Sequence, residues 1–315
     1  MRFIALTKYT RATESRWWRR LIEVAAYPGV VVVAVAVGYL WLQAGTNPAL
    51  VLPVMIGATG LGIFALEHLH PYVGEWRLTP DKLRADLLHT VFSNGAVQLG
   101  FEALFLGGLV WVADEIAGTV GLELWPTTWP VIAQLALGLV VIELATYWVH
   151  RTFHNTTAGW KIHSVHHSSD QLYLLASARN HPLAVVCMAA AELSPLVLLG
   201  APGELIALSA LFTAVHGMIQ HANVEMRPGF LHWVMSAPDL HRWHHAREVE
   251  DANANFGNNL IIWDLVFGTR FLPADRPVPT TAGIEGMAFP ESYKAQLAAP
   301  WIFKSLFVES EDQAA

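Results

Sequence analysis

Cysteine is almost absent from this chain, since Cys187 is the only one among 315 residues. A single thiol excludes an intrachain disulfide framework, a zinc site built from cysteines, and an iron–sulfur cluster held by this chain alone. The sequence also contains no HExxH zinc-peptidase pattern, no CxxCH haem-attachment motif and no GxGxxG dinucleotide fingerprint. Any metal site must therefore use other ligands, and any redox chemistry needs electrons from a separate protein.

Charged residues are scarce as well. They make up 14% of the chain, against about 25% in soluble domains, and the mean hydropathy is +0.38. The net charge of −7 gives no indication of nucleic-acid binding. Four apolar runs are long enough to cross a bilayer, and they cover residues 21–43, 49–66, 87–111 and 129–149. Two shorter runs, 183–199 and 205–219, predict a hairpin that enters the membrane or two short spans.

These runs predict an all-α integral membrane bundle of four spanning helices plus the short hairpin, with a cytoplasmic helical cap. The predicted parts are a basic N-terminus (1–20), helices 1–4 (21–149), a histidine-rich domain (150–271) that includes the hairpin 183–221, and a C-terminal cap and tail (272–315). The first apolar run is too long for a cleavable signal peptide.

Loop charges predict the orientation of the bundle. The first twenty residues carry six basic side chains and a single acidic one, Glu14, so we expect them in the cytoplasm. Residues 67–86 again contain Arg and Lys, whereas 114–129 contain only acidic charges. We expect a multi-pass protein of a bacterial inner membrane whose two termini and histidines share the cytoplasmic side.

Eight histidines fall into three groups with spacings of three or four residues. The groups are His150-Arg-Thr-Phe-His154, His163-Ser-Val-His166-His167 and His241-Arg-Trp-His244-His245. On a helix these spacings place imidazoles on one face. Neutral imidazole is the commonest protein ligand for borderline metals, so the groups predict a metal centre.

The number of histidines indicates two metal ions. One ion takes about four to six ligands, and His216 and His221, at the end of the hairpin, raise the candidates to ten. Without thiolates or HExxH, iron is the favoured metal, and zinc-dependent hydrolysis and metal transport remain alternatives. We predict that His68, His70, His89 and His232 are hydrogen-bonding groups at the membrane interface, and that His181 supports a ligand from outside the metal centre.

Glu143 lies inside the fourth apolar run, seven residues before His150. Seven residues are two helical turns, so Glu143 shares a face with Tyr147, His150 and His154. Because an ionisable group in a membrane helix is costly, we expect a functional role, in which Glu143 accepts the second N–H of a ligand histidine.

From Glu143 to Phe271 the chain resembles the fatty acid hydroxylase/sterol desaturase superfamily of membrane-bound, histidine-rich di-iron oxygenases. The resemblance rests on motifs in order, which are Tyr147–Arg151, His154, His163–Ser169, Arg179–Pro182, His221–Asn223, Pro238–His245, Asn255–Gly257 and Trp263–Thr269. It implies that the eight grouped histidines and His221 ligate two iron ions, with His216 as a further candidate. Asp264 is expected to orient backbone or ligand groups.

The resemblance also implies a reaction. O2 is the co-substrate, and an external donor, such as a ferredoxin or a small haem carrier with its reductase, supplies electrons. The expected reaction is hydroxylation of a C–H bond in a membrane lipid, on a fatty acyl chain or an aminolipid head group. Desaturation or oxidation of a sterol or another polycyclic lipid is the alternative. The sequence does not distinguish these substrates, and it does not reveal the oligomeric state.

Overall fold

Helices form nearly all of the regular structure in the computed structural model, which describes residues 17–76, 78–120 and 124–308. Within these ranges there is no named strand, only two isolated β-bridges. The apolar half of the chain contains α1 (Trp17–Gln43), α2 (Pro48–Leu69), α3 (Pro80–Leu88), the π-helical η1 (His89–Val97), α4 (Gln98–Val120), α5 (Val131–Asn155), α7 (Pro182–Leu198) and α8 (Gly203–His221).

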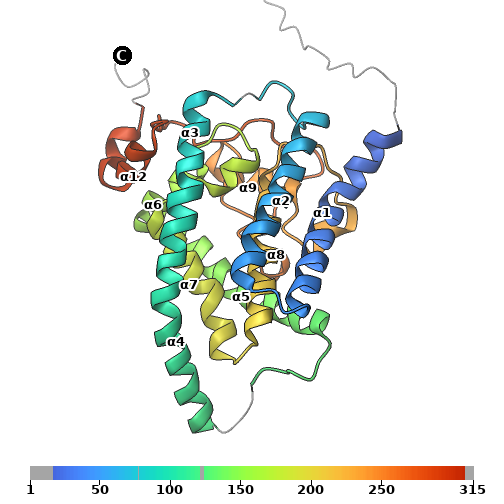
Figure 1. Ribbon diagram of the computed structural model, residues 1–315. Coiled ribbons are helices and arrows are strands. Elements are labelled where there is room, and N and C mark those ends of the chain that lie inside the picture. The colour runs from blue at the N-terminus through green and yellow to red at the C-terminus, as the bar shows by residue number, and fades with distance from the viewer. Residues whose placement is uncertain (1–16, 77, 121–123, 309–315) are drawn as a thin grey trace, which may run out of the picture.

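Shorter helices form the cap at one end of the bundle (Figure 1). They are α6 (Thr157–His167), η2 (Leu174–Ala178), η3 (Gly229–Trp233), α9 (Pro238–His244), α10 (Val249–Ala252), α11 (Ile262–Phe267), α12 (Tyr293–Ile302) and η4 (Phe303–Leu306). The predicted all-α fold is confirmed. The last seven residues of the predicted C-terminal tail (309–315) and most of the basic N-terminus lie outside the described residues.

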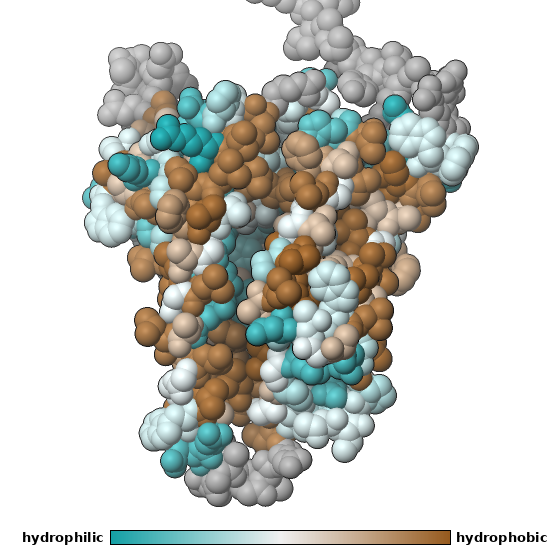
Figure 2. All heavy atoms as spheres, in the orientation of Figure 1, coloured by the Kyte–Doolittle hydropathy of each residue, from teal (hydrophilic) through white to brown (hydrophobic). Residues whose placement is uncertain are grey.

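Five helices in the described part of the chain are long and apolar enough to cross a membrane: α1, α2, the continuous α3–η1–α4 unit, α5 and α8. The first four correspond to the predicted spans. The fifth is the second arm of the predicted hairpin, which is therefore long enough to span by itself, whereas α7 is shorter. Figure 2 shows apolar side chains along most of the length of the visible helices, as expected for surfaces that face lipid.

Helix starts follow from local sequence. The side chain of Asn47 accepts from the N–H of Ala49 before α2, and Thr79 accepts from Lys82 before α3, with a proline in the first turn of each helix. Thr156 accepts from the N–H of Gly159 and separates α5 from α6. A Cβ at Gly159 would lie 2.6 Å from the Cα of Phe153, so only glycine allows this tight turn.

Packing places α8 at the centre of the bundle, in contact with α1, α2, α5 and α9. α5 and α4 both pack on α7. The main core joins side chains from α1, α2, α5 and α8, with Val215 and Ile219 fully buried. In this arrangement the C-terminal ends of α5 and α8 point into the cap, beside α6 and α9, so histidines that are distant in sequence meet there.

Gly38 allows the close approach of α1 and α8. A Cβ at Gly38 would lie 2.3 Å from Cδ2 of the buried Leu211, whereas one at Gly29, in the same helix, would have nothing within 4 Å. We expect Gly38→Ala to lower the midpoint of thermal unfolding in detergent, at a cost of about 1–3 kcal/mol from overpacking. Gly29→Ala is the control and should not lower it. Equal midpoints for the two variants would contradict the tight α1–α8 contact.

Candidate metal centre

The structure divides nine histidines into two adjacent groups. His150, His154, His163, His167 and His244 form one group, and His166, His221, His241 and His245 form the other. Within each group one nitrogen from every ring lies within 4.8 Å of the others. The helix ends of α5 and α8, together with α6 and α9, supply all but one of these residues, His245, which directly follows α9. The predicted convergence of the three sequence groups therefore occurs, and its division into two sets matches the expectation of two ions.

Four of these rings have a fixed orientation because their Nδ1–H donates to a backbone carbonyl. His150 donates to Phe256 (2.8 Å) and His244 to Ala254 (2.7 Å) in the first group.

In the second group His166 donates to Arg179 (3.2 Å) and His221 to Gly217 (2.7 Å). A carbonyl oxygen only accepts, so Nδ1 must carry the proton in all four neutral rings. Each Nε2 then carries a lone pair that points toward the centre of its group, as in a metal-ligating histidine.

Some of these lone pairs can accept from a neighbouring ring, since Nε2 of His150 lies 3.0 Å from Nε2 of His163, and Nε2 of His221 lies 2.9 Å from Nε2 of His241. Others have no such donor. Nε2 of His166 lies 3.2 Å from Nε2 of His221, although both rings carry their proton on Nδ1. Two lone pairs at this distance repel unless a cation lies between them or beside them. Nε2 of His154, His167 and His244 is also buried without a hydrogen-bond partner. Buried polar atoms are rarely left unsatisfied, so these residues fit bound metal cations.

Burial also sets the protonation state of the rings in the cap. It lowers the pKa of His163, His166 and His167 well below the usual range. It has the same effect on the pKa of the three rings of the last group, His241, His244 and His245. The cause is the loss of hydration of the charged imidazolium, and neighbouring histidines add repulsion. All six rings are therefore neutral near pH 7, which is the form that binds metal.

Two buried carboxylates hold the loop that orients His150 and His244. Asp264 accepts from the N–H groups of Phe256 (2.8 Å) and Gly257 (2.7 Å). Glu143 accepts from the N–H of the next two residues, Asn258 and Asn259, the latter at 2.8 Å. The expected direct hydrogen bond from a ligand histidine to Glu143 is therefore absent, and Glu143 acts through the backbone. The physical reason is that both carboxylate oxygens of Glu143 already accept from N–H groups of the loop.

Asn255 shapes the same loop. It adopts a left-handed backbone conformation, with φ of 54°, which asparagine tolerates better than most residues. Its side-chain amide donates to the carbonyls of Leu240 and Phe271. A Cβ at Gly257 would lie 2.3 Å from the carbonyl oxygen of Leu260, so glycine is required there. The motif Asn255-Phe-Gly257 thus makes a turn whose Phe256 carbonyl accepts from Nδ1 of His150.

His216 is the predicted ligand that the structure does not bring to either group. Its Nε2 lies 2.8 Å from the hydroxyl of Tyr27, and its ring stacks on Phe212. It lies five residues before His221 on α8, about 140° around the helix, so its ring faces a different direction from that of His221. His181 is also outside, because it caps α7 by accepting from Leu183 and donates to the carbonyl of Leu297.

Most of the remaining histidines make the hydrogen bonds that were predicted for them. His68 donates to Phe64, His89 pairs with Gln296, and His232 lies 3.2 Å from Asp239. The carbonyls of Ala254, Phe256, Arg179 and Gly217 are the functional groups that sequence reasoning missed. Because they belong to the backbone, no residue type signals them.

A cavity of about 470 Å³ reaches the first group. His154 and His167 form part of its wall, together with Trp160 of α6. The rest of the lining comes from the cap, and includes Ala246, Arg247, Val249, Ala252, Ile284 and Glu285. This volume lies within the range of small-molecule sites, about 300–1,000 Å³. A substrate can therefore approach the first group through this cavity.

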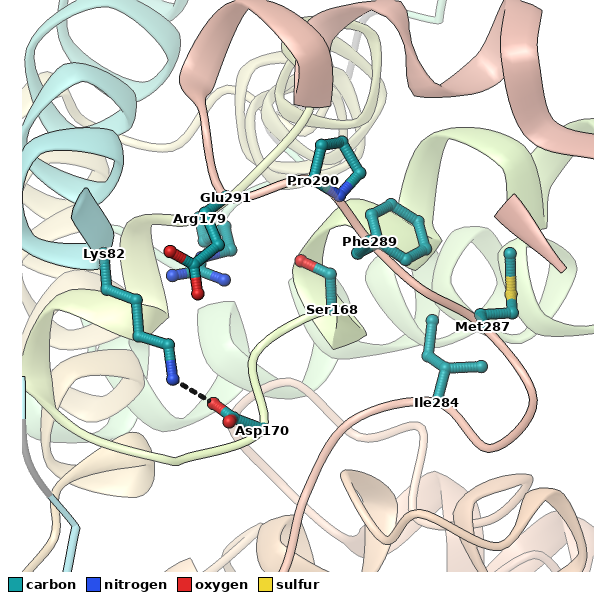
Figure 3. Close-up of a pocket in the computed structure, with 9 residues that line it drawn as sticks. All are labelled: Lys82, Ser168, Asp170, Arg179, Ile284, Met287, Phe289, Pro290 and Glu291. Atoms are coloured by element: carbon teal, nitrogen blue, oxygen red, sulfur yellow. Dashed lines mark hydrogen bonds and ion pairs between the residues drawn. The ribbon is translucent and has the colours of Figure 1, made fainter. Parts of the chain in front are cut away.

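A smaller hollow of about 180 Å³ is lined by Ser168, which directly follows α6, and by residues of the cap (Figure 3). Lys82 donates to Asp170 at 2.6 Å across it, and Arg179 and Glu291 complete its charged lining. Arg179 also pairs with the buried Asp86 at 2.7 Å. No histidine lines this hollow, so its link to the metal centre is indirect, through the Arg179 carbonyl that accepts from His166.

Pairs of substitutions separate the two histidine groups. We expect His154→Ala/His244→Ala to lose about one metal ion per chain relative to the wild type, and His221→Ala/His245→Ala to lose the other, because each removes two ligands of one ion. Elemental analysis of the purified variants measures this loss. His232→Ala is the control and should lose none. A variant pair that keeps the full metal content would contradict the assignment.

The lowered pKa values predict a pH-dependent stability of the metal-free protein. As pH falls from 7 to 5, the unfolded histidines take up protons near their ordinary pKa of about 6.5, while the buried rings do not. Each such ring then lowers the free energy of unfolding by up to about 1.4 kcal/mol for each unit by which the pH falls. Denaturation of chelator-treated protein should show a steep decline over this range and little change from pH 8 to 7. A flat profile between pH 7 and 5 would contradict the neutral, buried state.

Comparisons with known proteins agree with this geometry. Residues 135–269 match the model of the fatty acid hydroxylase family. The chain is 36% identical to ornithine lipid hydroxylase OlsE of Rhizobium tropici over 244 residues, which cover 76% of this chain and 73% of that protein.

More distant relatives include alkylglycerol monooxygenases. Identity is 30% to the protein of Danio rerio, over 58% of this chain and 39% of that protein. It is 31% to the protein of Homo sapiens, over 41% of this chain and 28% of that protein. The chain thus spans well under half of these monooxygenases. No solved structure matches it significantly.

Proposed function

Because this chain belongs to the fatty acid hydroxylase family, as the resemblance in its histidine motifs predicted, we propose that it is a membrane-bound di-iron oxygenase that hydroxylates a C–H bond of a lipid. The observation that carries the proposal is the pair of histidine groups, whose Nε2 lone pairs face one another at the end of a membrane-type bundle. The named relatives are a lipid hydroxylase and a monooxygenase, which agrees with this reaction class.

We propose the nine converging histidines as the iron ligands, five for one ion and four for the other. Iron bound there would supply the oxidising power for R–H + O2 + 2 electrons + 2 protons giving R–OH + H2O. His216 is left out of the ligand set because it pairs with Tyr27. Glu143 and Asp264 are positioning residues, since they hold the loop whose carbonyls orient His150 and His244.

The protein's own contribution is to position the substrate and to limit the access of water. The cavity beside His154 and His167 has an apolar wall with Trp160 and Ile284, which suits a lipid, and it carries Arg247 and Glu285. Two opposite charges in its lining favour a substrate whose reacting carbon lies near a polar head group. Figure 2 shows a furrow between α4 and α2 on one face of the bundle, which offers a sideways route from the bilayer.

Electrons are proposed to come from a separate donor, a ferredoxin or a small haem carrier with its reductase. The chain has one cysteine and no haem or dinucleotide motif with which to carry them itself. We further propose that the histidine end faces the cytoplasm, where such donors are found. The positive-inside rule supports this orientation through the Arg and Lys residues that precede α1 and occur between α2 and α4.

The proposal predicts an oxygen-dependent change in membrane lipids. Lipid extracts from cells that express the protein should contain species heavier by one oxygen atom than those of control cells, as measured by mass spectrometry. His154→Ala/His244→Ala should reduce this product on the order of 100-fold or more, because it removes two ligands. His232→Ala should retain it.

Other products would identify other functions. A loss of two hydrogens would indicate a desaturase. A reaction that continues without oxygen or reductant, in a protein that contains zinc, would replace the proposal with a hydrolase. Metal flux into liposomes without any lipid product would indicate a carrier.

A further inference from the structure

A third group of potential ligands lies outside the histidine centre. His70 directly follows α2, Glu23 lies in the second turn of α1, and Glu225 follows α8. Nε2 of His70 is 3.5 Å from Oε1 of Glu23 and 3.8 Å from Oε2 of Glu225. One ligand atom from each of the three residues lies within 4.8 Å of the others. Ligands that share one ion at about 2.1 Å lie roughly 3–4 Å apart, so the spacing suits a metal ion.

The buried nitrogen of His70 points to a ligand. Its side chain is only 5% exposed, and its Nε2 makes no hydrogen bond within the described part of the chain. This nitrogen faces the two carboxylates at distances too long for a hydrogen bond. Leaving it unsatisfied is unfavourable, and a bound cation would offset that cost.

A protonated His70 between two carboxylates is the competing explanation. Burial lowers the pKa of His70, although Glu225 and Glu23 act in the opposite direction and Arg19 adds to the lowering. The neutral ring is therefore the favoured state near pH 7. A neutral imidazole is a metal ligand and does not form an ion pair.

Surrounding contacts fix the three side chains from separate elements. The N–H of Glu225 donates to the carbonyl of His70 at 3.1 Å, and the N–H of Arg227 donates to the carbonyl of Glu23. The guanidinium of Arg227 pairs with Oε2 of Glu23 at 2.8 Å, which leaves Oε1 facing His70. Glu23 and Glu225 are themselves only 11% and 14% exposed.

We propose that Glu23, His70 and Glu225 bind a third metal ion, a divalent transition-metal cation such as Zn²⁺. Imidazole together with two carboxylates suits a borderline cation better than Mg²⁺. The ion ties the start of α1 and the end of α2 to the segment that leaves α8. Glu225 lies four residues after His221, so this clamp steadies the end of α8 that enters the second histidine group. The proposal is independent of the reaction that the histidine centre performs.

Zinc counting tests the proposal in the intact chain. Purified protein in detergent is stripped with a chelator, loaded with Zn²⁺, washed and measured by elemental analysis. His70→Gln should bind about one zinc ion fewer per chain than the wild type. The matched control is His68→Gln, in the last turn of the same helix, whose ring donates to the carbonyl of Phe64 and contacts the Phe64 ring. It should bind as much zinc as the wild type.

A second variant distinguishes the loss of a ligand from misfolding. Glu225→Gln keeps the size of the side chain and removes one ligand charge, so it should also lose about one zinc ion. Binding to the histidine centre is checked in the same samples with His154→Ala/His244→Ala, whose loss should add to that of Glu225→Gln. If His70→Gln and Glu225→Gln both bind as much zinc as the wild type, the three residues are an ion-pair cluster and the proposal is wrong.

Discussion

The geometry of the candidate metal centre depends on backbone carbonyls that fix the imidazole rings. A histidine can bind metal through either nitrogen, and the proton on Nδ1 decides that Nε2 is the free one. In this protein the carbonyls of Ala254 and Phe256 make that choice for His244 and His150. Those carbonyls are aimed correctly only because Asp264 and Glu143 hold four successive N–H groups of the same loop. Two buried carboxylates therefore act on the centre without touching a ligand.

This arrangement explains why two carboxylates are tolerated deep in an apolar chain. An unpaired carboxylate in such surroundings is costly, whereas each of these accepts at least two backbone N–H groups. The fold places these carboxylates close to the proposed ligands. α5 carries Glu143 and two of the proposed ligands, while α11 carries Asp264. A single rigid helix thus fixes both the ligands and part of their support, and metal binding, loop conformation and helix packing become parts of one structure.

The bundle and the cap have different roles, and each role follows from the polarity of its side chains. The bundle buries its apolar core through α8 and presents apolar side chains outward, as a lipid environment requires. The cap carries the polar groups that need hydrogen-bond partners, and the helix ends bring the histidines to the boundary between the two.

The sequence alone determined the helical, membrane-type fold, the family and the three histidine groups, because hydropathy and short spacings are local properties. It also placed all three groups at one end of the bundle from hydropathy and loop charge. Only the tertiary structure decided how the rings divide into sets of five and four, because His244 and His245 are neighbours in sequence and yet serve different groups. Only it removed His216 from the centre, turned Glu143 toward a loop instead of a histidine, and brought His70 to Glu23 and Glu225. The reason is that the direction of a ring and the backbone group that it bonds depend on contacts between residues far apart in sequence. Glu143 and Asn259, for example, lie more than one hundred positions apart, and short sequence spacings do not predict such contacts.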